Sequence, residues 1–203
     1  MDSGNRGFTI IELMVTVAVI VILMLIAQPS FEGLRQRAAI RGAGEHLASF
    51  WNQARLEAAK RNSMIKVGVV QSSSGATFCL GAATTTDPTD TVPCDCTSAS
   101  PGSDVCDIAR FPSDQSDWRQ VTLSGITLGG GTNLTDIEAV VIEPKRTNLV
   151  VPTDAGTITL NGPAGQFDYR LNLAVDRFGK AQLCESTSAT DHLSDYASRQ
   201  CAP

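Results

Sequence analysis

Aromatic side chains and histidines are scarce in this chain of 203 residues: aromatics make up 5% of it, and only two histidines occur. So few rings leave little material for a platform that stacks nucleic-acid bases. The formal net charge of −5 argues against a general polyanion binder. A hydrophobic content of 42% excludes a wholly disordered chain.

Sequence signatures of catalysis are also lacking. Neither His46 nor His192 stands in a nucleophile motif, and no Gly-x-Ser-x-Gly sequence occurs. We therefore expect a protein that is not an enzyme and that uses no cofactor.

The longest uniform feature is an apolar run from Phe8 to Ala27 that contains one charge, Glu12. As a helix it would be about 30 Å long, which is the thickness of a bilayer core. A cleaved secretory signal does not fit, because no Ala-x-Ala site follows the run. A plain membrane anchor leaves Glu12 unexplained, since a carboxylate costs about 2.5–3.5 kcal/mol at the centre of a membrane helix.

The segment Gly7-Phe8-Thr9-Ile10-Ile11-Glu12-Leu13-Met14-Val15 resembles the class III leader of type IV pilins and pseudopilins. The resemblance implies that a prepilin peptidase cuts between Gly7 and Phe8 and methylates the new amine of Phe8. Glu12 and Pro29 then stand at mature positions where the family carries these residues. Glu12 would set subunit register by pairing with the Phe8 amine of a neighbour at low dielectric, and Pro29 would kink the helix.

Beyond Phe31 the pattern is that of an amphipathic helix reaching about Asn62. One face is cationic, and it is either solvated or a contact surface for anionic headgroups or adjacent subunits. The apolar side chains recur every three or four residues, at Ile40, Ala43, Leu47, Phe50, Trp51, Ala54 and Ala58. The cations of the other face are Arg35, Arg37, Arg41, Arg55, Lys60 and Arg61.

The rest of the chain predicts strands, most clearly in the alternating segment Phe167–Val175, which a turn at 176–179 joins to a strand at 180–184. The other expected strands are 64–70, 77–80, 121–128, 137–142 and 157–160. The expected fold is α+β and pilin-like: a long N-terminal helix packed on an antiparallel sheet. We divide the chain into a cleaved leader at 1–7, a transmembrane and filament-core helix at 8–31, and a periplasmic globular domain at 32–203.

No cysteine occurs in the first 78 residues, and this distribution fits a domain in an oxidising compartment. The six cysteines are Cys79, Cys94, Cys96, Cys106, Cys184 and Cys201, and they allow 15 complete pairings. Many pilins close a C-terminal loop, and this likeness implies a Cys184–Cys201 bond. Cys94 and Cys96 would each reach Cys79 or Cys106, because a bond between the two would be strained.

The segment 82–117 reads as irregular, and a loop this long suggests function or disorder. Zinc at Cys94, Cys96 and Cys106 has the wrong ligand spacing and no nearby histidine. Calcium at Asp87, Asp90 and Asp95 would lack the ordered spacing of a calcium loop. We expect a stapled loop without metal.

Two segments resemble the GspH/FimT/FimU group of minor pilins and pseudopilins: 51–58 and 178–184. The resemblance implies a FimU-like minor pilin that helps to initiate a type IV pilus near its tip. Its partners would be other minor pilins, the major pilin and the prepilin peptidase, and it would lie in the inner membrane before it joins the extracellular pilus. A type II secretion pseudopilin remains open as an alternative.

A FimT-like DNA receptor for transformation is the other alternative. Relatives that bind DNA carry a Gly-Arg-x-Arg motif in the C-terminal tail, whereas the tail here sets Glu185, Asp191 and Asp195 against Arg199. From Val67 onward the chain has 16 acidic and 8 basic residues. Phosphate binding needs cationic charge, and the sequence therefore does not favour DNA as a partner.

Overall fold

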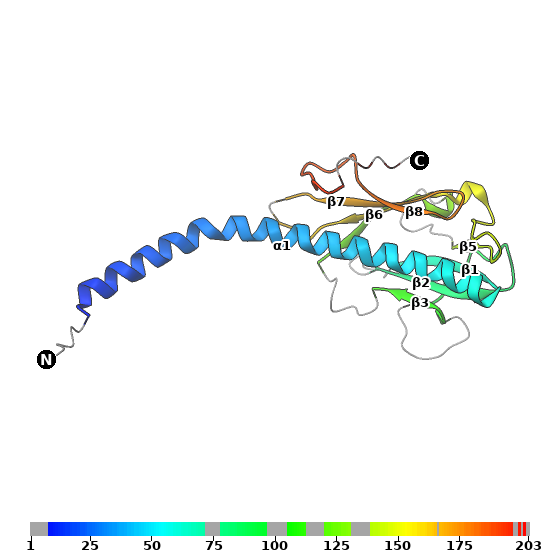
Figure 1. Cartoon of the computed structure of the whole chain (residues 1–203), viewed down its shortest axis with the longest axis horizontal. Coiled ribbons are helices and arrows are strands. Elements are labelled where there is room, and N and C mark those ends of the chain that lie inside the picture. The colour runs from blue at the N-terminus through cyan, green and yellow to red at the C-terminus, as the bar shows by residue number, and fades with distance from the viewer. Residues whose placement is uncertain are drawn as a thin grey trace, which may run out of the picture.

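In the described part of the chain, one long helix packs on two antiparallel sheets. The computed structural model describes residues 8–71, 78–96, 105–112, 120–130, 139–165, 167–196, 199 and 201, with the backbone alone for residues 26–30 and 71. Helix α1 (Ile10–Arg61) has 52 residues. Its N-terminal part projects away from the domain, and its C-terminal part packs against strands of both sheets (Figure 1).

Both ends of α1 are capped by residues suited to the task. Thr9 is the N-cap, and its side chain accepts a hydrogen bond from the backbone N–H of Glu12. Asn62 ends the helix in the left-handed conformation with φ 49°, which asparagine tolerates better than most residues. The predicted C-terminal limit of the helix is therefore confirmed.

The amphipathic half of α1 buries the stripe expected from the sequence. All seven apolar side chains of that stripe are at most 4% exposed, and Trp51 is completely buried. Gly44 is also buried on this face, where a Cβ would collide with the Leu171 side chain. Burial of these side chains holds the helix to the sheets, since each removes apolar area from water.

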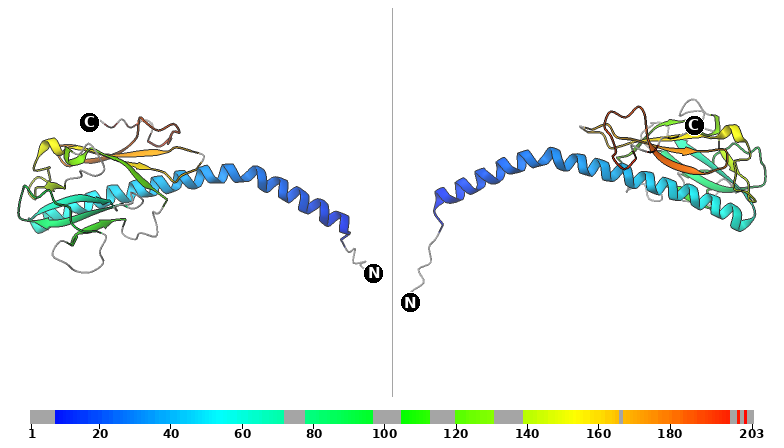
Figure 2. Two further views of the ribbon diagram at one scale, coloured as in Figure 1. Left: turned by 180° about the vertical axis from the view of Figure 1, so that it is seen from behind. Right: turned by 45° about the horizontal axis from the view of Figure 1, so that its top comes forward.

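The helix continues without a break through Pro29, and it is curved over its length (Figures 1 and 2). The predicted membrane segment, 8–31, includes residues 26–30, whose side chains lie outside the described part. Within the described residues, no helix combines the length and the hydropathy that a membrane crossing requires.

The first sheet has the strand order β3-β2-β1-β5 and the second has the order β4-β6-β7-β8, and neighbouring strands in both sheets are antiparallel. The first consists of β1 (Met64–Gln71), β2 (Phe78–Thr85), β3 (Ala109–Phe111) and β5 (Val140–Ile142). The second consists of β4 (Thr122–Ile126), β6 (Gly156–Asn161), β7 (Arg170–Val175) and β8 (Ala181–Glu185). Two short 3₁₀ turns occur at Leu128–Gly130 and Pro152–Asp154.

The α+β, pilin-like class is as expected, with two sheets in place of one. The predicted strands are present, although β7 begins at Arg170 and not at Phe167, and β2 extends to Thr85. The described part of the segment 82–117 is less irregular than expected, because β2 enters it and it contains β3, while residues 97–104 and 113–117 lie outside the described part. The expected turn after β7 is present, and Gly179 there has φ 69°, which favours glycine.

Candidate assembly site

The N-terminal part of α1 presents an apolar surface with no cover from the domain. Among the described residues from Phe8 to Leu25, every large hydrophobic side chain is about half exposed or more, with Phe8 at 84%. Soluble monomers rarely expose a continuous apolar surface of this kind. This part of the helix must therefore be covered by lipid or by other protein chains.

Glu12 lies in the first turn of α1 and is exposed. Its backbone N–H donates to Thr9 Oγ1 at 3.3 Å, so Thr9 is the N-cap residue and Glu12 occupies the N3 position. A negative charge is also favourable there because the helix dipole is positive at this end. Thr9 at the start of the apolar run was the signal in the sequence for the start of this helix.

Two of the helix arginines are bound to the chain's own domain. Arg37 Nε donates to the Tyr169 hydroxyl at 2.7 Å, and its guanidinium lies 5.3 Å from the centre of the Tyr169 ring. Arg41 pairs with Asp195 at 2.6 Å in a half-exposed ion pair. These arginines link the helix to the residue before β7 and to the C-terminal tail, so they are not simply a solvated face.

The cations near the C-terminal end of α1 also form hydrogen bonds or ion pairs within the protein. Arg55 Nη2 donates to Thr147 Oγ1 at 3.0 Å, while Lys60 and Arg61 both bind Glu57, at 3.1 and 2.8 Å. The hydrogen bond from Arg61, followed by that from Lys60, lowers the pKa of the Glu57 carboxyl below its usual value.

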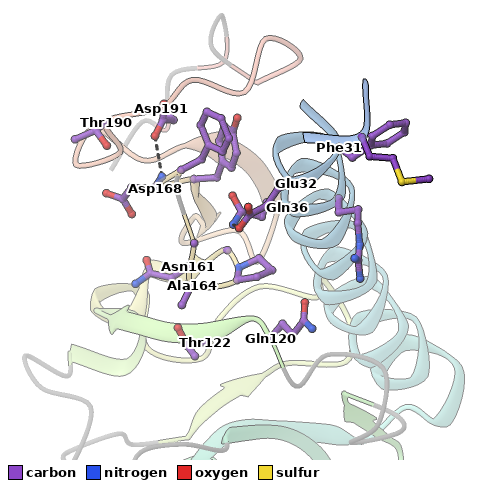
Figure 3. A pocket seen from close by; sticks show the side chains of 17 residues that line it. Phe31, Glu32, Gln36, Gln120, Thr122, Asn161, Ala164, Asp168, Thr190 and Asp191 are labelled. Atoms are coloured by element: carbon purple, nitrogen blue, oxygen red, sulfur yellow. Dashed lines mark hydrogen bonds between the residues drawn. The ribbon is translucent and has the colours of Figure 1, made fainter. Parts of the chain in front are cut away.

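An open cleft of about 1260 Å³ lies where α1 leaves the domain. Figure 3 shows Phe31, Glu32 and Gln36 on the helix side, across from Asn161 and Asp168. The Gln36 side chain is almost wholly buried, and its Nε2 donates to Glu32 Oε1 at 3.5 Å. The cleft thus joins the exposed apolar surface of the helix to a wall rich in hydrogen-bond acceptors.

The helix approaches this wall closely because two contact positions are glycines. A Cβ on Gly33 would lie 2.9 Å from the Phe167 ring, and a Cβ on Gly165 would collide with Gln36 Nε2. Phe167 in turn stacks on Tyr169, with ring centroids 5.7 Å apart. These contacts fix the direction in which α1 leaves the domain.

The C-terminal tail folds back onto the domain through its acidic residues. Glu185 Oε1 accepts the Leu193 backbone N–H at 2.8 Å, and Asp191 Oδ2 accepts the Asp168 N–H at the same distance (Figure 3). The Tyr196 hydroxyl lies 3.4 Å from Glu45 Oε1. Burial, and then the charge of Glu45, raises the pKa of the Tyr196 hydroxyl.

Three disulfides stabilise the loops: Cys184–Cys201, Cys79–Cys96 and Cys94–Cys106. The C-terminal bond is the one that the likeness to pilins implied. Cys94 and Cys96 have different partners, as expected. None of the six cysteines is left as a thiolate for zinc.

Asp87 and Asp90, two of the aspartates considered as calcium ligands, bind other groups of the protein. Asp87 Oδ1 accepts the backbone N–H and the hydroxyl of Thr89, at 2.8 and 2.7 Å, and Asp90 pairs with Lys66. In the described part of the chain, no group of three histidine, cysteine or acidic residues is placed to hold a metal ion.

Comparison with known proteins identifies the N-terminal segment. Residues 2–28 match the model of the prokaryotic N-terminal methylation motif. No curated protein and no solved structure matches the chain significantly. Gly7, the expected cleavage residue, lies within the match but outside the described residues. The motif, the long helix and the disulfide-bonded antiparallel sheets together make this chain a type IV pilin-like protein with an N-terminal methylation motif.

Proposed function

We propose that this protein is a minor pilin that helps to initiate a type IV pilus and lies at or near its tip. The observation that carries the proposal is the exposed apolar half of α1, which bears the methylation motif and continues without interruption into the domain core. Before assembly this half lies in the inner membrane, with the domain in the periplasm. On assembly it moves into the filament core.

In this proposal Glu12 acts through its side chain, since its contact with Thr9 is made by the backbone N–H, which any residue at this position would supply. In the filament its carboxylate pairs with the methylated Phe8 amine of a neighbour, released by cleavage after Gly7. A charge that needs a partner at low dielectric penalises misregistered packing more than it adds net stability.

The C-terminal tail supports a structural role over DNA capture. Asp191 and Asp195 of the tail bind groups of the domain, and Glu185, at the end of β8, binds the Leu193 N–H of the tail. Arg199, its one cation, lies over the Tyr196 ring at 5.4 Å. A tail arranged in this way offers little charge for the phosphate contacts on which DNA affinity depends.

The experiment compares Glu12→Ala with Glu12→Gln in the full chain. Glutamine keeps the size and polarity of the Glu12 side chain but has no charge. We expect both variants to be cleaved and to reside in the membrane fraction, and both to be lost from sheared pili. Immunoblots of the membrane and sheared fractions measure this.

Incorporation of Glu12→Gln at the wild-type level would overturn the charge-pairing role of Glu12. Deletion of the gene should reduce surface pili without abolishing synthesis of the major subunit. Normal piliation combined with a loss of type II secretion would instead favour the pseudopilin alternative.

A further inference from the structure

Four exposed cations gather on two loops at the domain end that is remote from the N-terminus. Lys145 and Arg146 lie between β5 and the 3₁₀ turn at Pro152–Asp154, while Arg177 and Lys180 flank the turn between β7 and β8. We refer to these four residues as the cationic loop patch. No described carboxylate forms an ion pair with any of them.

The two loops are fixed against each other and against α1. The Leu149 backbone N–H donates to the Arg177 carbonyl at 3.4 Å, and Trp51 Nε1 donates to the Gly179 carbonyl at 2.8 Å. Thr147 packs so closely on Gly179 that a Cβ there would collide with the Thr147 carbonyl. The four cations are therefore held near one another by backbone contacts.

The local backbone at Thr147 is strained. Thr147 has φ 55°, which is unusual for a β-branched residue. The hydrogen bond from Arg55 to Thr147 Oγ1 helps to hold it there and places a further positive charge behind the loop. Strain of this kind persists only where the surroundings impose it, and it is common at functional sites.

Two acidic groups near the patch, Asp176 and Asp87, are occupied by other contacts. Asp176 Oδ1 accepts the backbone N–H groups of Phe178 and Lys180, at 2.9 and 2.8 Å, and Asp87 is bound to Thr89. Glu143 also lies nearby and is half-buried. From Val67 to the C-terminus the chain has 16 acidic and eight basic residues. Four of those eight basic residues lie in the patch.

An aromatic side chain lies within the patch. Phe178 is 54% exposed, and the Arg177 guanidinium lies 5.0 Å from the centre of its ring. Arginine and aromatic residues are enriched at protein interfaces and supply most of their binding hot spots.

We propose that the cationic loop patch and Phe178 form a docking surface for an acidic protein partner. Charge complementarity favours a compact acidic protein surface, which can cover the patch alone. A nucleic acid would extend beyond the patch onto a domain with twice as many acidic as basic residues. This inference is independent of the proposed function, since it specifies a second surface away from the apolar helix.

The test uses the purified full chain in mild detergent and fluorescence anisotropy. The probes are a labelled glutamate-rich peptide containing leucines and a labelled single-stranded oligonucleotide of similar length. Arg146→Glu combined with Arg177→Glu should weaken peptide binding about tenfold or more. Arg35→Glu combined with Arg199→Glu makes the same change in net charge on two exposed arginines outside these two loops, and this variant should bind as the wild type does.

Two further measurements separate loss of charge from loss of fold. Arg146→Lys combined with Arg177→Lys should retain most of the peptide affinity, and thermal melts of all variants should match the wild type. Tighter binding of the oligonucleotide than of the peptide at equal ionic strength would overturn the proposal in favour of a nucleic-acid site. Absence of peptide binding, or binding unaffected by the patch reversal, would also overturn it.

Discussion

Single side chains connect parts of this protein that are distant in sequence. Trp51 was predicted as a core residue from its place in the apolar stripe, and its burial confirms this. Its hydrogen bond to the Gly179 carbonyl, 128 residues away, could not be predicted, because periodicity specifies a buried face but not the partner across it. Arg37 and Arg41 were likewise visible as cations, whereas their partners Tyr169 and Asp195 required the fold.

The ion pair between Lys66 and Asp90 predicts a pH dependence of stability. The two atoms lie 2.8 Å apart, with side chains 12% and 23% exposed. The hydrogen bond from Lys66 is the main cause of the lowered pKa of the Asp90 carboxyl. Because the folded-state pKa lies below the unfolded one, the stabilisation is present above about pH 4 and is lost as pH falls through the folded-state value.

Asp90→Asn should therefore reduce the free energy of unfolding by about 1–2 kcal/mol near pH 7, since Lys66 is left partly buried without its partner. The difference from the wild type should shrink as the pH falls below about 4. Urea unfolding at a series of pH values measures this. Asp195→Asn removes a half-exposed ion pair and should cost less than about 1 kcal/mol; an equal effect of both variants would refute the argument.

At the scale of elements, the sequence predicted α1 and most strands but not their division into two sheets. Alternation identifies a strand, while its neighbours depend on contacts between distant segments. Strand β3 was missed because three residues, Ala109–Phe111, are too few to establish a period. The predicted start of β7 was too early because Phe167 and Tyr169 pack at the cleft beside α1, where Gly33 gives them room.

The Cys184–Cys201 bond is predicted to stabilise the second sheet together with the tail. It joins the last strand to the tail, with Cα atoms 5.5 Å apart and a separation of 17 residues. Replacing both cysteines by alanine should lower the free energy of unfolding by about 3 kcal/mol in the chain-entropy model. Urea unfolding of the full chain in detergent measures the change, and an unaltered midpoint would contradict it.

At the scale of the whole molecule, the methylation motif predicts that the chain is a precursor, seven residues longer than the mature form that begins at Phe8. Gly7→Arg should block removal of the first seven residues, because the residue before the expected cleavage site is changed. Intact-mass spectrometry of the membrane fraction should then find the precursor and no chain beginning at Phe8. Detection of mature, methylated Phe8 in this variant would exclude Gly7 as a requirement for processing.

The continuity of α1 has a mechanical consequence. With 52 residues the helix is about 78 Å long, and one end lies in the domain core while the other is free of it. A pull on the free end is directed along the helix axis, so it loads the buried stripe in shear. The contacts of that stripe then share the force and do not open one after another, and the hydrogen bonds of Trp51 and Arg55 resist the same displacement.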